Sequence, residues 1–154
     1  MPNKNFFFNS GFEGDDKDLA VFTQLEYERQ NSKLIMIASE SLCPAPVRNA
    51  LTTPFINKYA EGYPSLRMSQ DEIAQLMDVP RFLSFQRRYG DRRHYKGCEF
   101  ANFVESLAQK RCAEIFANPN APLDSVFVNV QPLSGAAANN AIYEAFVKPG
   151  DIVM

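Results

Sequence analysis

The sequence has 154 residues, of which 45% are hydrophobic and 22% are charged, as is usual for one soluble globular domain. Its net charge of −2 argues against a nucleic-acid-binding surface, and no apolar run approaches the roughly 18–20 residues that span a bilayer. Three cysteines without CxxC spacing and a single histidine predict no disulfide framework and no metal site, and they favour a reducing compartment.

The first third of the sequence contains two predicted helical segments and one predicted strand. Residues 1–17 are expected to form either an arm that docks its phenylalanines on a partner or a disordered tail. A helix is predicted over 18–31, with Asp18 as its N-cap and apolar side chains at helical spacing. A short strand is expected over 34–37, and a proline is expected to open helical turns over 46–51.

The loop 57–64 reads Asn-Lys-Tyr-Ala-Glu-Gly-Tyr-Pro and is the most informative stretch of the chain. It places the phenols of Tyr59 and Tyr63 and the carboxylate of Glu61 within five positions, beside Gly62. These groups indicate a chemically active loop, although tyrosine and glutamate are also common at ordinary solvated surfaces.

The middle of the chain contains a capping-box pattern and a basic cluster. Ser69-Gln-Asp-Glu matches the capping box, which predicts a short helix behind it that ends before Pro80. The cluster that follows consists of Arg87, Arg88, Arg92, Arg93, His94 and Lys96. It would either bind an anionic ligand through charge-assisted bonds or, as we expect, form a solvated basic face. His94 is expected to be a loop residue rather than a general base.

The last third of the sequence predicts a long helix and two strands. Apolar residues recur three and four positions apart over 100–116, and Cys112 lies on that apolar face. Strands are expected over 126–130 and 152–154. A typical strand has about 5–6 residues, so we expect the chain to end inside an element and to be a fragment of a longer protein.

Between those two strands, Ser134-Gly135 is predicted to open a helix that ends before Pro149. A strand, a tight turn and a helix start would bring free amides and the positive end of a helix dipole to one point. The turn therefore predicts a phosphate site, or simply an ordinary N-cap.

Four segments in this order resemble serine hydroxymethyltransferase. They are Ile-Met-Ile-Ala-Ser-Glu at 35–40, the loop 57–64, Tyr-Lys-Gly-Cys-Glu at 95–99, and Val-Gln-Pro-Leu-Ser-Gly-Ala-Ala-Ala-Asn at 130–139. The resemblance runs from about Leu34 to the last residue, with one interruption.

The resemblance implies an α/β fold: the N-terminal part of the aspartate-aminotransferase-like (fold type I) pyridoxal-phosphate fold, truncated in the large domain. Residues 1–33 would form an arm and a helix, 34–99 the interface and active-site loop with an insertion at 65–92, and 100–154 the start of the cofactor-binding domain. It also implies a cytoplasmic homodimer with pyridoxal phosphate as cofactor, tetrahydrofolate as co-substrate, and serine and glycine as substrates, without a nucleic-acid or membrane partner.

The resemblance assigns roles to the residues of the loop. Glu61 would be the acid–base carboxylate, and Tyr59 and Tyr95 would complete the catalytic group. Glu61 and Tyr95 would also contact substrate, and Ser39 would lie against the substrate carboxylate. Tyr59, Glu61 and Tyr95 would reach across the dimer interface into the neighbouring cofactor pocket.

The same resemblance places the cofactor phosphate at Ser134, Gly135 and Ala136. Many relatives have a second serine at the last of these positions, whereas Ala136 can offer only its amide.

The chain departs from the family pattern in three ways. Residues 65–92 are inserted, His94 replaces the first tyrosine of Arg-Tyr-Tyr, and the cofactor-binding lysine of the family has no match among the 154 residues. We therefore expect the chain to be inactive alone. The alternative is a non-catalytic regulatory chain that pairs with a full-length subunit.

Overall fold

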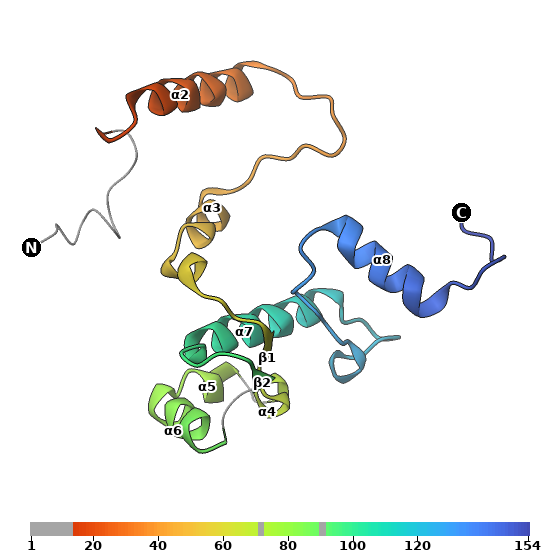
Figure 1. Ribbon diagram of the computed structural model, residues 1–154. Helices are drawn as coiled ribbons and strands as arrows, with labels where there is room; N and C mark the ends of the chain where they lie inside the picture. The colour runs from red at the N-terminus through yellow and green to blue at the C-terminus, as the bar shows by residue number, and fades with distance from the viewer. Residues whose placement is uncertain (1–13, 71–72, 90–91) are drawn as a thin grey trace, which may run out of the picture. The chain divides into compact units, whose positions relative to one another are not determined.

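The computed structural model describes residues 14–70, 73–89 and 92–154. The chain divides into two units, Met1–Asn57 and Lys58–Met154, which are described one after the other (Figure 1). No helix among the described residues is long and apolar enough to cross a membrane. Most of the arm predicted over 1–17 lies outside the described residues.

Helix α2, Lys17–Ser32, is the longest element of the first unit. Its N-cap is Asp16, whose Oδ1 accepts a hydrogen bond of 2.9 Å from the Leu19 amide. The prediction that Asp18 is the N-cap is wrong, because Asp16 has the non-helical backbone of a cap, with φ −133° and ψ 89°. Asp18 lies inside the first turn instead, where its negative charge favours the helix dipole.

An ion pair lies on the exposed surface of α2. The Arg29 guanidinium donates two hydrogen bonds of 2.7 Å to the two carboxylate oxygens of Glu26, and Gln30 Nε2 donates another of 2.8 Å. These bonds, first from Arg29 and then from Gln30, lower the pKa of Glu26 from its ordinary 4.5 to about 2. The same pairing raises the pKa of Arg29.

The rest of the first unit contains short helical turns. Helix α3, Ala45–Leu51, carries a proline in its first turn, as predicted, and the 3₁₀ helix η2, Pro54–Asn57, follows it. The strand predicted over 34–37 is wrong, because these residues have no regular secondary structure. A strand is stabilised by hydrogen bonds to a neighbouring strand, and the described part of this unit contains no other strand that could supply them.

The second unit is organised around a small two-stranded antiparallel sheet, called the hairpin below, although a long helical segment joins its strands. Strand β1, Gly62–Tyr63, pairs with β2, Arg92–Arg93, so that Gly62 lies opposite Arg93 and Tyr63 opposite Arg92. The chain therefore leaves the hairpin after β1 and returns to it at β2. The segment predicted as an insertion is anchored at both ends by this pairing.

The insertion is helical. It contains α4, Leu66–Gln70, α5, Ile73–Leu76, and α6, Val79–Tyr89. The predicted helix end before Pro80 is confirmed, since α5 ends at Leu76 and Pro80 lies in the first turn of α6. The predicted capping box depends on residues 71–72, which lie outside the described residues; the Ser69 backbone lies within α4.

A small apolar core joins the insertion to α7, Glu99–Phe116. Met68, Leu76 and Phe82, one from each helix of the insertion, are buried together, and the Phe82 and Phe103 rings pack edge to face with centroids 6.2 Å apart. Gln86 Nε2 also donates to the Met68 sulfur at 3.1 Å. Figure 1 shows the three short helices as a cluster beside α7.

Helix α7 confirms the predicted helix over 100–116, but it buries a different face. Its buried side chains are Asn102, Ser106 and Ala113, whereas Phe100 is exposed and Cys112 is only partly buried. The hairpin packs against this face, and its Arg93 supplies a hydrogen-bonding partner for Asn102, whereas the buried Ser106 hydroxyl has no hydrogen-bond partner among the described residues.

The chain after α7 has little sheet structure. It runs through the 3₁₀ helix η3, Leu123–Ser125, to α8, Gly135–Phe146. The strands predicted over 126–130 and 152–154 are wrong, because neither segment has a partner strand among the described residues. Phe127 is 93% exposed as a result. Of the expected α/β fold, the described residues form helices and one two-stranded sheet.

Candidate functional site

The two tyrosines predicted as catalytic, Tyr59 and Tyr95, lie together. Their rings pack edge to face, with centroids 5.2 Å apart and an interplanar angle of 87°. The hairpin explains this contact, because pairing of β1 with β2 brings the residues before β1 beside the residues after β2. Both side chains remain largely exposed, so a ligand can still reach them.

The third predicted catalytic residue, Glu61, faces His94 across the same hairpin. The His94 amide donates to the Glu61 carbonyl at 2.9 Å, which extends the strand pairing by one residue on each side. Nδ1 of His94 lies 3.3 Å from Oε1 of Glu61, and the two side chains are 63% and 50% exposed. The structure thus places Glu61 at the same end of the hairpin as the Tyr59–Tyr95 pair.

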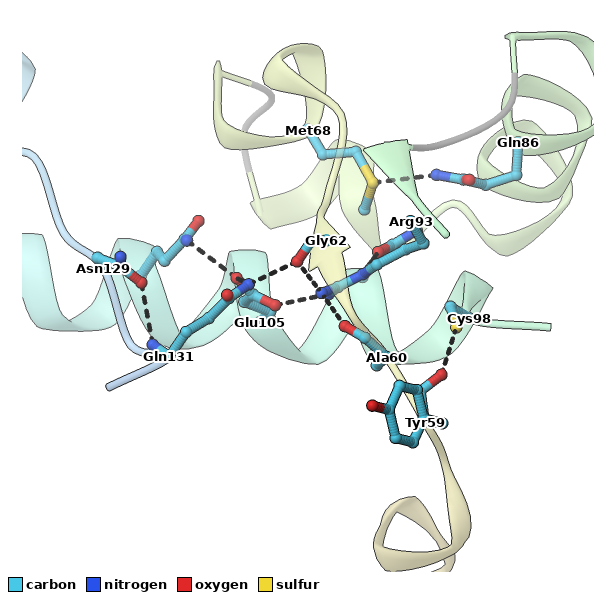
Figure 2. Close-up of polar contacts among 12 residues, drawn as sticks. Tyr59, Ala60, Gly62, Met68, Gln86, Arg93, Cys98, Glu105, Asn129 and Gln131 are labelled. Atoms are coloured by element: carbon cyan, nitrogen blue, oxygen red, sulfur yellow. Dashed lines mark hydrogen bonds and ion pairs between the residues drawn. The ribbon is translucent and has the colours of Figure 1, made fainter. Parts of the chain in front are cut away.

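Arg93 holds the backbone of this loop from within the protein. Its Nη1 donates hydrogen bonds of 2.6 Å to the carbonyl groups of Ala60 and Gly62, the two neighbours of Glu61 (Figure 2). The Arg93 side chain is only 2% exposed. The prediction of a solvated basic face is therefore wrong for Arg93, although Arg92 beside it is exposed and lies over the Tyr63 ring at 5.7 Å.

Helix α7 supplies the other partners of Arg93. Nε donates to Asn102 Oδ1 at 2.7 Å, and Nη2 pairs with the Glu105 carboxylate. Gln131 joins the same network from a distant segment, since its Nε2 donates to the Gly62 carbonyl and to Glu105 Oε1, each at 2.8 Å. Figure 2 shows Gln131 and Arg93 converging on Gly62 and Glu105.

Cys98 fixes the other end of the loop. It is fully buried, and its Sγ donates to the Tyr59 carbonyl at 3.6 Å. Gly97 before it has φ +80°, a left-handed conformation that glycine adopts without a steric penalty. The backbone is thus held on both sides of Glu61, while the side chains of Tyr59 and Glu61 face solvent.

The predicted phosphate turn has the geometry of a helix start. Ser134 is the N-cap of α8, and its Oγ accepts a hydrogen bond of 3.2 Å from the Ala137 amide. Gly135 and Ala136 form the first turn, where amides lack partners inside the helix. The space around Gly135 is open, since an added Cβ would meet no atom within 4 Å. These donors fit a phosphate group.

Ser39 belongs to the first unit and is described only within it. It lies in an exposed turn that is closed by a hydrogen bond of 3.0 Å from the Glu40 amide to the Ile37 carbonyl. The predicted substrate contact of Ser39 stays a prediction.

Sequence reasoning missed Asn102, Glu105 and Gln131. A signal for the first was available, because Asn102 and Ser106 are four residues apart and interrupt the apolar pattern of α7 on one face. Gln131 gave no comparable signal, since its partners are far away in the sequence.

Comparison with known proteins shows the family to which the chain is similar. The family model for serine hydroxymethyltransferase matches residues 12–88 and 82–154. The chain is similar to the serine hydroxymethyltransferase of Bifidobacterium adolescentis, with 35% identity over 97% of this chain and 27% of that protein. It is also similar to serine hydroxymethyltransferase 3 of Colwellia psychrerythraea, with 38% identity over 96% of this chain and 27% of that protein.

The serine hydroxymethyltransferase of Kocuria rhizophila is 39% identical over 90% of this chain and 25% of that protein. The chain therefore spans about a quarter of the length of these relatives. No solved structure gives a significant match.

Proposed function

The chain belongs to the serine hydroxymethyltransferase family, and from this premise we propose that it forms part of a pyridoxal-phosphate-dependent transferase. The reaction would interconvert serine plus tetrahydrofolate with glycine plus methylenetetrahydrofolate. In this proposal 1–33 is an arm with a helix, 34–99 carries the active-site loop, and 100–154 begins the cofactor-binding domain of fold type I.

The observation that supports this proposal best is the grouping of Tyr59, Glu61 and Tyr95 at one end of the hairpin. The Arg93 side chain fixes the carbonyl groups on both sides of Glu61, so the carboxylate is presented from a constrained backbone.

The residues that would hold the cofactor phosphate are Ser134, Gly135 and Ala136. The amides of the first turn of α8 and the positive end of its dipole would bind the phosphate. When it is bound, pyridoxal phosphate supplies the electron sink for bond cleavage at the amino-acid α-carbon.

Glu61 would exchange the proton of the substrate hydroxyl during this cleavage. Its half-exposed carboxylate can reach a ligand, and the Tyr59–Tyr95 ring pair at the same end of the hairpin would help to orient that ligand. A positioned acid–base group typically contributes about 10²–10⁴-fold to the rate.

We propose that the functional species is a dimer in which Tyr59, Glu61 and Tyr95 serve the neighbouring site. None of the lysines in these 154 residues has the sequence setting of the family's cofactor lysine, so we expect no serine cleavage by this chain alone. Pairing with a full-length subunit, in a catalytic or a regulatory role, is the alternative organisation.

The proposal is tested in a full-length relative whose matching segment is replaced by 58–154 of this chain. Glu61→Gln should preserve cofactor absorbance and reduce serine cleavage by about 10²–10⁴-fold. Glu114→Gln, an exposed change on α7, is the control and should leave both unchanged. In mixed dimers, activity should return only at the site that receives an unmodified Glu61. Full activity of the Glu61→Gln homodimer would refute the assignment.

A further inference from the structure

His94 is the only histidine of the chain and lies directly opposite Glu61. The hydrogen bond from the His94 amide to the Glu61 carbonyl makes the two residues cross-strand neighbours at the open end of the hairpin. Directly opposite residues of an antiparallel pair have Cβ atoms about 4.5–5.5 Å apart on one face. The 3.3 Å approach of Nδ1 to Oε1 is therefore a consequence of the strand register.

The backbone below this pair is rigidly held, whereas the two side chains are open to solvent. Arg93 bonds the carbonyl groups of Ala60 and Gly62, and Arg93 itself is the neighbour of His94. More than half of the His94 side chain is exposed, so its other ring nitrogen is accessible to a ligand. This combination of a fixed backbone and accessible polar groups is typical of a binding or catalytic site.

A carboxylate close to one imidazole nitrogen determines which nitrogen carries the proton. In a neutral imidazole one nitrogen donates and the other accepts, and a carboxylate beside Nδ1 favours the proton on Nδ1. Nε2 of His94 is then left with its lone pair available to a hydroxyl or N–H group of a ligand.

We propose that Glu61 exchanges the substrate proton through His94: it orients the imidazole so that Nε2, rather than Glu61 itself, accepts the proton from the hydroxyl group of a hydroxy-amino-acid substrate. The inference rests on the proposed function and deepens it. In the transfer, the hydroxyl proton passes to Nε2, and the positive charge that forms on the imidazole is balanced by the adjacent Glu61 carboxylate. The hydroxyl oxygen becomes a carbonyl oxygen when the adjacent C–C bond breaks, and the proton held on Nε2 is returned to the amino-acid product, so both residues end unchanged.

The orientation is tested by ¹⁵N NMR of the 154-residue chain, in which all imidazole signals belong to His94. At alkaline pH we expect the form with the proton on Nδ1 to dominate in the unchanged chain and in Glu61→Gln, because the glutamine oxygen still accepts. Glu61→Ala should shift the population to the Nε2 form, and the control Glu114→Ala should not. Dominance of the Nε2 form in the unchanged chain, or no effect of Glu61→Ala, would overturn the proposal.

The reactivity of Nε2 is tested at the same alkaline pH by acylation with diethyl pyrocarbonate, which reacts with the unprotonated imidazole nitrogen. The rate should fall several-fold in both Glu61→Ala and Glu61→Gln, because both remove the negative charge, and it should be unchanged in Glu114→Ala. Equal rates in all four chains would refute the proton-acceptor role. Neither measurement needs the cofactor, so these results are independent of the serine-cleavage test of the proposed function.

Discussion

Arg93 and Glu105 form an ion pair that links the hairpin to α7 and is almost completely enclosed, with side chains 2% and 11% exposed. Because Glu105 also accepts from Gln131, this pair connects the loop 57–64 to the segment that leads to Ser134. The two parts of the proposed site are thus joined through one hydrogen-bond network, whose centre at Arg93 is buried and whose outer member, Gln131, is exposed.

Arg93→Ala should therefore disrupt the second unit. Removing one partner of a buried pair typically costs about 3–5 kcal/mol, because the remaining charge is left unpaired. Arg92→Ala is the matched control: Arg92 is exposed and lies over the Tyr63 ring, an interaction of about 0.5–1 kcal/mol at such sites. Hydrogen exchange of the α7 amides measures the loss of stability in each variant. Similar losses in the two variants would contradict the burial of Arg93.

Gly62→Ala should open the hairpin. Gly62 has φ +103°, and an added Cβ would lie 2.8 Å from the Arg93 Cα and closer still to the Arg92 carbonyl oxygen. Gly150 has a similar φ of +98° but open space around it, so Gly150→Ala isolates the backbone strain of roughly 1–2 kcal/mol.

The destabilisation by Gly62→Ala should exceed that by Gly150→Ala because of the added clash, and the Tyr59 and Tyr95 ring signals should lose their mutual NOEs only in the former. Retention of those NOEs in Gly62→Ala would show that the hairpin is not needed to bring the rings together.

The helices could be predicted from the sequence because their signals are local. Ser134 caps α8 through an amide three residues away, and the proline of α3 lies in its own first turn. The strand predictions were wrong because a strand depends on a partner that is distant in the sequence. Residues 126–130 have no partner strand among the described residues.

The loop 57–64 could be singled out by its chemistry and by resemblance, but the residues that support its backbone could not. Arg92 and Arg93 are identical in type and adjacent in sequence, yet one faces solvent and the other is buried. The difference arises from strand alternation, which turns successive side chains to opposite faces, and from the polar face of α7 against which β2 packs.

Phe82→Ala should unfold the helical insertion locally. Phe82 is buried with Met68 and Leu76, and loss of a buried phenylalanine costs about 3–5 kcal/mol. Leu66→Ala, at a residue that is 67% exposed, should change stability by no more than about 0.5 kcal/mol. Amide protection in α5 and α6 should fall in Phe82→Ala while the Arg93 network keeps the hairpin amides protected. Equal protection in both variants would argue against this apolar core.

The stability of α2 should depend on pH through Glu26. Because the folded-state pKa is lowered from 4.5 to about 2, its stabilisation is fully present above about 4.5 and is lost as the pH falls toward 2. Amide protection of α2 should therefore decline over this interval. Glu26→Gln should reduce the amide protection of α2 at pH 7, since Arg29 loses its charged partner. The decline in protection between about pH 4.5 and 2 that Glu26 causes should then disappear. Glu28→Gln, at a residue bonded to Gln24 rather than to an arginine, is the control and should keep the decline. An unchanged acid profile in Glu26→Gln would show that the pair with Arg29 does not stabilise the helix.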